Sequence, residues 1–235
     1  MSKDHFIKEI FSNVANKYDL MNDLMSLGIH RIWKSQFCSL VENLDSKILD
    51  VASGSGDIAF RLHKLCLANG ITPEITLTDV NEKMLQVAKD RAIDLNILSD
   101  LEFIVADATK LPFEDNSFDY YTIAFGIRNI CDMDGALAES YRVLKPKGHF
   151  LCLEFSKPTM PIMRDIYNLY LEKVIPKIGQ LVTNHQEAYE YLADSIKAFP
   201  EQSVFLNMMQ KAGFKIANFK NLSNGVACIY FGYKS

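Results

Sequence analysis

The sequence lacks the cysteine and histidine spacings that mark disulfide frameworks and metal sites. Its five cysteines, at positions 38, 66, 131, 152 and 228, are scattered, odd in number and free of any CxxC pair. This usage is typical of reduced thiols in a cytoplasmic protein. The five histidines show no ligand spacing either, so we expect no bound metal.

Long apolar runs and an excess of positive charge are also absent. No uninterrupted apolar run approaches the roughly 18–20 residues that a membrane-spanning helix needs. The first residues, MSKDHFIKEIF, carry charges throughout and lack the apolar core of a signal peptide. The formal net charge of −4 argues against a dedicated nucleic-acid-binding protein, which usually has a basic face. We therefore expect a cytoplasmic protein with no nucleic-acid partner.

From position 47 onward, short apolar runs rich in β-branched residues alternate with stretches of helical periodicity. This alternation predicts a mostly parallel sheet with helices on both faces. The 235 residues are 49% hydrophobic and suit one large α/β domain over 1–235. The expected strands are Ile48–Val51, Ile75–Thr78, Leu101–Val105, Tyr120–Phe125 and Phe150–Leu153, and the expected helices are Asp57–Leu67, Met84–Asp94 and Asp134–Leu144.

Three further segments complete the expected architecture. Residues 1–45 read as an N-terminal helical extension, from the helical spacing of Phe6, Ile7, Ile10, Phe11 and Val14. Residues 157–200 read as a helical insertion with an apolar stripe, and we favour core packing of that stripe over a lid on an apolar substrate. The stripe consists of Ile162, Ile166, Leu169 and Tyr170. Phe214–Phe219 and Val226–Tyr233, separated by Asn224-Gly225, predict a closing antiparallel pair.

The stretch LDVASGSGD, residues 49–57, joins an expected strand to an expected helix. Small residues in such a turn let a ligand approach the backbone amides at the helix N-terminus. A dinucleotide enzyme prefers a third glycine, which is missing, and Asp50 suits a cationic ligand better than a pyrophosphate. We therefore expect Gly54, Ser55 and Gly56 to contact a nucleotide-like cofactor, and we disfavour a dehydrogenase.

Two more expected strands end in aspartates. Asp79 lies 25 residues after Gly54, close to the roughly 20 expected of an acid that binds ribose hydroxyls. Asp107 is suited to accept a hydrogen bond from an adenine amino group, while the neighbouring backbone at Ala108 meets a ring nitrogen. A helix cap or a solvated turn is the alternative for Asp79, and a turn former is the alternative for Asp107. Because ligands bind at the carboxyl ends of parallel strands, we favour ligand contact.

These acids, the Asp50-to-Gly56 turn and the late hairpin resemble the class I S-adenosylmethionine-dependent methyltransferases. More specifically, the chain resembles the ubiquinone/menaquinone biosynthesis C-methyltransferase family over nearly its whole length. Two signatures carry the resemblance: YDLMNDLMS at 18–26 with HRIW at 30–33, and RVLKPKG at 142–148 with EFS at 154–156. FGIRN at 125–129, YLADSI at 191–196 and GYK at 232–234 also match.

The sequence departs from the family pattern at a few positions. The family usually has Gly-Gly-Thr where this chain has Ser53-Gly54-Ser55. Ser55 keeps a hydroxyl, whereas Ser53 requires backbone dihedral angles that a non-glycine residue can adopt. A glycine is usual where Lys147 stands, so the geometry of that turn is in question.

The resemblance implies a Rossmann-like fold with a mostly parallel seven-stranded sheet and a final antiparallel strand. It implies methyl transfer from S-adenosyl-L-methionine to a ring carbon of a prenylated quinol. That acceptor is a 2-methoxy-6-polyprenyl-1,4-benzoquinol, a demethylmenaquinol or both, in ubiquinone/menaquinone biosynthesis. Arg128 and Asn129 match the family's proposed catalytic pair, and we expect Arg128 to stabilise the quinol oxygen and Asn129 to fix its position. A guanidinium that only satisfies loop carbonyls is the alternative.

Other residues and partners stay open at this point. His30 and Tyr18 are further candidates near the site, although a packing role is commoner for a lone helical histidine. Glu154 could approach the substrate, hold Arg128 or cap a helix, and residues 166–178 are a candidate wall for the prenyl tail. We expect transient contact with the inner face of the membrane, and a homodimer or an association with other quinone-biosynthesis enzymes. The rival functions are methylation of another small molecule, such as a sterol or an amine, and a cofactor-binding scaffold.

Overall fold

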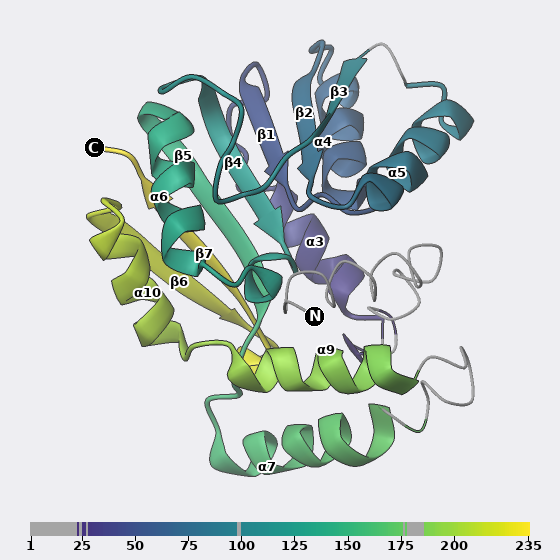
Figure 1. The fold of residues 1–235 in the computed structure, drawn as a ribbon, viewed down its shortest axis with the longest axis vertical. Coiled ribbons are helices and arrows are strands. Elements are labelled where there is room, and N and C mark those ends of the chain that lie inside the picture. Colours follow the sequence, from purple (N-terminus) through teal and green to yellow (C-terminus); the bar gives the residue numbers. More distant parts are fainter. Residues whose placement is uncertain (1–22, 24, 27, 98–99, 176, 178–185) are drawn as a thin grey trace.

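One seven-stranded sheet organises the computed structural model, which describes residues 23, 25–26, 28–97, 100–175, 177 and 186–235. The strand order is β3-β2-β1-β4-β5-β7-β6 (Figure 1). The strands are β1 (Lys47–Val51), β2 (Glu74–Asp79), β3 (Leu101–Val105), β4 (Phe118–Ala124), β5 (Leu144–Phe155), β6 (Ile216–Leu222) and β7 (Ala227–Tyr233). β1 to β5 pair in parallel, and β7 runs antiparallel to both β5 and β6. The predicted mostly parallel sheet with a final antiparallel strand is confirmed.

The sheet is buried on both faces because alternate side chains enter two separate hydrophobic clusters. In β5, Leu151 and Leu153 belong to one cluster, whereas Phe150 and Cys152 belong to the other. The period of two along a strand produces this division. Strands buried on both faces read as nearly continuous apolar runs, which is the pattern that made them recognisable in the sequence.

Helices cover the two faces and the carboxyl edge of the sheet. The first cluster includes residues of α3, α4, α5 and α9, and the second includes residues of α6 and α10. α9 lies beyond the carboxyl edge of the parallel strands, and α7 lies outside α9 (Figure 1). The helices are α3 (His30–Cys38), α4 (Asp57–Ala68), α5 (Glu82–Asp94), α6 (Met133–Val143), α7 (Pro161–Leu169), α9 (Gln186–Ala198) and α10 (Gln202–Lys211), with short turns η3 (Ile127–Asn129), η4 (Tyr170–Val174) and η5 (Ser223–Gly225).

Two helical segments differ from the sequence analysis. α10 was not predicted, although Phe205 and Met209 are spaced four residues apart and are buried against β7 and α6. Core packing of the apolar stripe is wrong for Ile162, Ile166 and Leu169, which are exposed by 71%, 57% and 58%. Periodicity identified the helix but did not show which of its sides faces the protein.

The departure at Lys147 falls on a left-handed turn. Lys147 has φ +66°, a conformation that favours glycine, and its N–H donates to the carbonyl of Lys234 at 2.7 Å. The turn lies inside β5, where the pairing with β4 shifts register between Phe118 and Tyr120. The doubt about this turn is resolved: lysine occupies the glycine-favouring conformation, and the C-terminal backbone holds it there.

The N-terminal extension is described only in part. α3 packs against α4 and β5, and Trp33 is buried with its ring edge-on to Phe155. The Trp33 indole N–H donates to the hydroxyl of Ser223 at 3.1 Å, so this residue anchors α3 to the far end of the chain. Phe6, Ile7, Ile10, Phe11, Val14 and Tyr18 lie outside the described residues. Within the described residues, no helix is long and apolar enough to cross a membrane.

Candidate functional site

The candidate residues gather at the carboxyl edge of the parallel strands. β1 lies between β2 and β4. The strands up to β3 lie on one side of β1 and the later strands lie on its other side, so the strand order reverses between β1 and β4. Open α/β sheets bind ligands at such a switch point. The ends of β1, β2 and β3 form one half of this edge, here called the cofactor half. The ends of β4 and β5, with η3 and α9, form the acceptor half.

The turn after β1 adopts a conformation that requires its glycines. Gly54 and Gly56 have φ values of +55° and +82°. A Cβ atom on Gly56 would lie 2.8 Å from the Phe60 ring, and one on Gly54 would lie 3.2 Å from the Met84 methyl group. Positive φ extends to Ala52 at +49° but not to the neighbouring serine at position 53. The prediction that position 53 tolerates a non-glycine residue is therefore confirmed, and the unusual conformation falls one residue earlier.

Asp79 connects this turn to the end of β2. Its Oδ2 accepts the N–H of Gly54 at 2.9 Å, and its Oδ1 accepts the N–H of Asn81 at 2.8 Å. The N-cap of α5 is Asn81, whose side chain accepts the N–H of Lys83, so Asp79 is not the helix cap. The Asp79 carboxylate thus joins the glycine turn to the start of α5.

Asp107 and Ala108 lie at the same edge, next to Asp79. The N–H of Ala106 donates to the carbonyl of Asp79 at 3.1 Å, which joins the ends of β2 and β3. Asp107 is exposed, and its Oδ1 accepts both the N–H and the hydroxyl of Thr109 at 2.8 Å. The turn-forming role that we considered as an alternative is therefore present, and it uses one carboxylate oxygen. Ala108 is buried beside it.

Asp50 lies beneath the turn, inside the sheet. Its side chain is buried, and its Oδ1 accepts the hydroxyl of Thr122 in β4 at 2.8 Å. Burial raises the Asp50 pKa to about 7, against the opposing effects of that hydroxyl and the Ala59 amide. The carboxylate does not reach the surface of the edge. Its placement therefore gives no support to the interpretation that Asp50 faces a cationic ligand directly.

The glycine turn touches the loop after β4 directly. Gly126 follows β4, and a Cβ atom there would lie 2.6 Å from the Cβ of Ala52. A side chain at position 126 would therefore collide with the Ala52 methyl group unless one of the two loops shifted. Lys34 of α3 adds a second connection: its buried ammonium lies 2.8 Å from Asp57 Oδ2 and 5.9 Å from the centre of the Phe125 ring. The sequence analysis did not identify Lys34, because its role depends on how α3 packs.

Arg128 and Glu154 form a fully buried ion pair. Arg128 Nη1 donates to Glu154 Oε1 and to the carbonyl of Phe125, both at 2.6 Å. The guanidinium also lies 5.5 Å from the centre of the Phe155 ring. Burial raises the pKa of Glu154, and the positive charge of Arg128 opposes that rise. Of the alternatives left open for Glu154, the structure selects the one in which it holds Arg128.

Asn129 is contacted from the helical insertion. The hydroxyl of Tyr191 in α9 donates to Asn129 Oδ1 at 3.1 Å. Tyr191 entered the sequence analysis only as part of a matching stretch, since 62 residues separate it from Asn129. α9 thus lies over the loop that carries the two candidate catalytic residues.

His30 is a buried, paired residue at the start of α3. Its Nε2 lies 2.8 Å from Asp23 Oδ1, and Arg31 Nη2 lies 2.7 Å from Asp23 Oδ2. Hydrogen bonding from Arg31 lowers the pKa of Asp23 to about 2, whereas burial lowers the pKa of His30. This arrangement favours the packing interpretation of His30 over a catalytic base.

The comparisons with known proteins place the chain in a family. Residues 1–234 match the ubiE/COQ5 methyltransferase family. The chain belongs to this family. A Rickettsia bellii protein named ubiquinone/menaquinone biosynthesis C-methyltransferase UbiE is 56% identical over 99% of this chain and 94% of its own length. The Rickettsia felis protein of the same name is 55% identical with the same coverage.

Solved structures agree on the fold. A SAM-dependent methyltransferase from Thermotoga maritima, described as a possible histamine N-methyltransferase, has a TM-score of 0.66 and 19% identity. The alignment covers 97% of this chain and all of that one. A SAM-dependent methyltransferase from Aquifex aeolicus has a TM-score of 0.64 and 17% identity, with coverage of 95% and 98%. This ubiE/COQ5 family member therefore has the class I methyltransferase fold, whose cofactor is S-adenosyl-L-methionine.

The cofactor half fits that cofactor. The turn of Gly54, Ser55 and Gly56 presents backbone where two Cβ atoms would intrude on Met84 and Phe60. The carboxylates of Asp79 and Asp107 supply acceptors for hydroxyl and amino groups. Among the described residues, no group of three or more His, Cys, Asp or Glu side chains is arranged to hold a metal ion.

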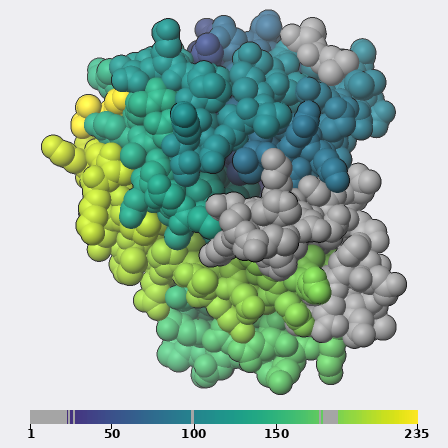
Figure 2. All heavy atoms as spheres, viewed as in Figure 1, coloured from purple at the N-terminus to yellow at the C-terminus, as the bar shows by residue number. Residues whose placement is uncertain are grey.

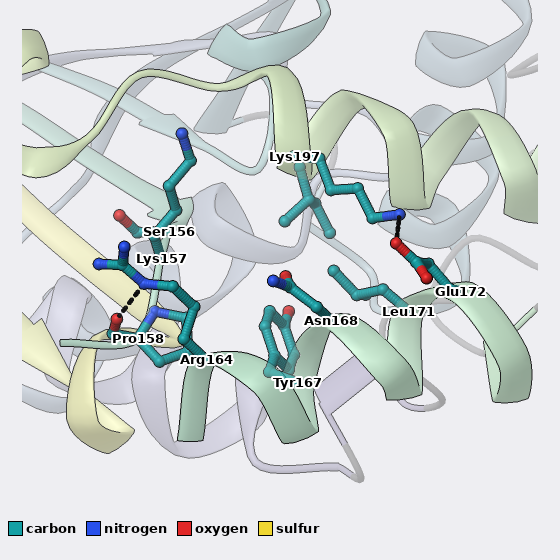
Figure 3. Close-up of a pocket in the computed structure, with 10 residues that line it drawn as sticks. Ser156, Lys157, Pro158, Arg164, Tyr167, Asn168, Leu171, Glu172 and Lys197 are labelled. Carbon is teal, nitrogen blue, oxygen red and sulfur yellow. Dashed lines mark hydrogen bonds and ion pairs between the residues drawn. The ribbon is translucent and has the colours of Figure 1, made fainter. Parts of the chain in front are cut away.

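A pocket of about 250 Å³ lies at the acceptor half, between α7, α9 and the segment after β5 (Figure 3). Tyr167 and Leu171 rise into it from α7 and η4, and Lys197 pairs across its mouth with Glu172 at 2.8 Å. Ser156 and Lys157 in its lining directly follow the end of β5, which carries Glu154, so the pocket lies near the buried ion pair. The lining residues are Ser156, Lys157, Pro158, Arg164, Tyr167, Asn168, Leu171, Glu172, Ile196 and Lys197.

Proposed function

We propose that this chain transfers a methyl group from S-adenosyl-L-methionine to a ring carbon of a prenylated quinol. Membership of the ubiE/COQ5 methyltransferase family over residues 1–234 carries the proposal. Relatives named for ubiquinone/menaquinone biosynthesis, at 55–56% identity over 99% of the chain, support it. The acceptor that we propose is a 2-methoxy-6-polyprenyl-1,4-benzoquinol, a demethylmenaquinol or both.

The cofactor half holds S-adenosyl-L-methionine in this proposal. Gly54, Ser55 and Gly56 place backbone against it, Asp79 accepts its ribose hydroxyls, and Asp107 with Ala108 contacts its adenine. The bound cofactor supplies a methyl group that its sulfonium already activates. The chain's own task is therefore to bring a nucleophilic carbon into line with that methyl group and to hold it there.

The acceptor must react as the quinol. A quinone ring is electrophilic, whereas loss of the phenolic proton pushes electron density onto the ring carbons ortho and para to the oxygen. A hydrogen-bond donor at that oxygen stabilises the developing charge. The sequence analysis expected Arg128 in this role, but its guanidinium is buried on Glu154. We therefore assign the role to the amide Nδ2 group of Asn129, whose Oδ1 accepts the hydroxyl of Tyr191.

In this proposal Arg128 supports Asn129 from the protein interior. Its guanidinium is buried and joined to Glu154, and it fixes the loop between β4 and η3 through the carbonyl of Phe125. Because the pKa of arginine lies above about 12, Arg128 does not take the phenolic proton. In this proposal a water molecule carries that proton, and Arg128 contributes position and positive charge.

The domain organisation belongs to the same proposal. Residues 1–235 form a single methyltransferase domain, with a helical extension at 1–45 and a lid at 157–200. The contact between Tyr191 and Asn129 supports the lid, because it ties α9 to the catalytic loop. Tyr167, Leu171 and Ile175 are buried residues of the predicted prenyl wall, and the first two line the pocket, whereas Ile166 is exposed. Transient contact with the inner face of the membrane is part of the proposal, and a homodimer or a larger assembly stays a prediction.

A mass-resolved methyl-transfer assay tests the function. Purified protein receives labelled S-adenosyl-L-methionine and, in separate reactions, a short-chain 2-methoxy-6-prenyl benzoquinol or a demethylmenaquinol, both reduced. Label on a ring carbon supports the proposal, and the ratio of the two products identifies the preferred ring. Cofactor binding without product from either quinol would contradict it and favour another small acceptor or a cofactor-binding scaffold.

A further inference from the structure

α7 carries an exposed apolar surface that packing inside the protein does not explain. We define the α7 ridge as Met160, Ile162, Met163, Ile166 and Leu169. The three most exposed, Ile162, Ile166 and Leu169, stand at helical spacing of four and three residues and therefore on one face. The opposite face turns Tyr167 and Leu171 inward to the pocket. Single exposed apolar residues are ordinary, whereas a contiguous group marks a contact surface.

The position of α7 leaves the ridge accessible. α7 lies at the outer margin of the molecule in both the ribbon and the space-filling views, with α9 between it and the sheet (Figures 1 and 2). The same short helix therefore presents one side to the surroundings and the other side to the pocket beside Arg128 and Glu154. Whatever covers the ridge is brought within one helix diameter, about 10 Å, of the acceptor half.

The charged residues near the ridge favour a partner surface that is anionic. Residues 157–177 contain four basic side chains and two acidic ones, whereas the whole chain has 25 basic and 29 acidic residues. Two of these charges are paired outside the segment: Glu172 with Lys197, and Arg164 with Glu201. The basic residues are Lys157, Arg164, Lys173 and Lys177. A second copy of the chain would bring the same surplus of positive charge to a two-fold interface, so this distribution disfavours self-association.

We propose that the α7 ridge docks this chain on an anionic phospholipid surface and so places the pocket beside a lipid-embedded acceptor. The identity of that acceptor rests on the proposed function, whereas the docking itself rests on the ridge and its charges. An apolar helix face bordered by Lys and Arg lies in the headgroup region with about 5–10 Å of burial and does not cross the bilayer.

The test is vesicle co-sedimentation of the full chain. The vesicles contain phosphatidylcholine alone or phosphatidylcholine with phosphatidylglycerol. We expect binding to the mixed vesicles, reduced about tenfold or more in an Ile162→Glu/Ile166→Glu variant. A Lys173→Gln/Lys177→Gln variant should lose affinity for the mixed vesicles, by up to about fivefold for each lysine. The matched control is Ile93→Glu/Leu95→Glu, which changes two exposed apolar residues at and just after the end of α5 and should bind as the wild type does.

The outcomes separate this inference from the proposed function. The ridge variant should methylate a short, dispersed quinol at the wild-type rate but lose most activity on a long-chain quinol embedded in vesicles. Absence of vesicle binding by the wild type, or equal loss in the α5 control, would overturn the docking proposal. Light scattering that shows a wild-type dimer and a monomeric ridge variant would overturn it too, in favour of a second copy. If the wild type binds the cofactor but methylates neither acceptor, the result would instead contradict the proposed function.

Discussion

In the cofactor half of the sheet edge, backbone groups hold the site: glycines at positive φ and amides that donate to Asp79. In the acceptor half, side chains from distant segments hold it: Arg128 on Glu154, and Tyr191 on Asn129. The cofactor half thus depends on backbone conformation and backbone donors, whereas the acceptor half depends on contacts between side chains. The two halves should therefore fail differently when they are mutated, and four experiments test this.

The largest effect is expected from Glu154→Leu. It leaves the Arg128 guanidinium buried without its carboxylate, which costs about 3–5 kcal/mol of unfolding free energy. Urea denaturation measures the loss. The double variant Arg128→Met/Glu154→Leu should recover most of it, because no buried charge remains. Glu172→Gln, which removes one charge from the partly exposed 2.8 Å pair with Lys197, should leave the unfolding midpoint nearly unchanged. A stable Glu154→Leu variant would show that the acceptor half does not depend on this pair.

Gly56→Ala is expected to destabilise the turn of the cofactor half and to lower the free energy of unfolding by about 2–3 kcal/mol. The loss comes from the cost of positive φ and from contact with the Phe60 ring. Isothermal titration should show a matching loss of affinity for S-adenosyl-L-methionine. Gly70→Ala is the control, because Gly70 also has positive φ but an added Cβ would meet nothing within 4 Å. Equal effects at both positions would mean that crowding at Gly56 is unimportant.

Asp50→Asn should change the pH dependence of stability. The folded pKa of Asp50, about 7, lies above the ordinary value of 3.8. Between these values the folded state retains a proton that the unfolded state has released, so the wild type loses stability as the pH rises. The loss between pH 6 and pH 8 amounts to about 1.4 kcal/mol and should disappear in the variant. Parallel stability curves for the two proteins would show that Asp50 does not titrate in this range.

Tyr191→Phe should have the smallest effect, because it removes one hydrogen bond to Asn129. We expect kcat to fall about three- to tenfold, corresponding to about 0.5–1.5 kcal/mol, with cofactor affinity unchanged. Tyr141→Phe, on the other face of the sheet, should leave kcat at the wild-type value. A change in cofactor affinity equal to the change in kcat would mean that Tyr191 supports the whole edge rather than its acceptor half.

The sequence predicted the cofactor half more completely than the acceptor half. Alternating apolar runs identified the parallel sheet, and the glycine turn, Asp79 and Asp107 indicated the edge that we assign to the cofactor, because each of them directly follows its own expected strand. The roles of Glu154 and Tyr191 stayed open or unnoticed. They lie 26 and 62 residues from their partners in the chain, and only the packing of β5 and α9 selects those contacts.

The helical insertion shows the same limit. Periodicity predicted a helix around Ile166, but it does not reveal which side of an isolated amphipathic helix faces the protein. Here the smaller buried set, with Tyr167 and Leu171, packs inward, and the more regular stripe remains outside. Family resemblance named Arg128 and Asn129, whereas Lys34 carried no motif and was found only through its contact with Asp57.

The close approach of Ala52 and Gly126 has a consequence for the order of events at the site. These residues belong to the two loops that we assign to the two ligands, and the Ala52 methyl group packs directly on Gly126. A shift of one loop on binding must therefore displace the other. By thermodynamic linkage, if the first ligand changes the affinity for the second by some factor, the second changes the affinity for the first by the same factor. If the two loops bind the two substrates as we propose, this one contact would couple their binding before any methyl group moves.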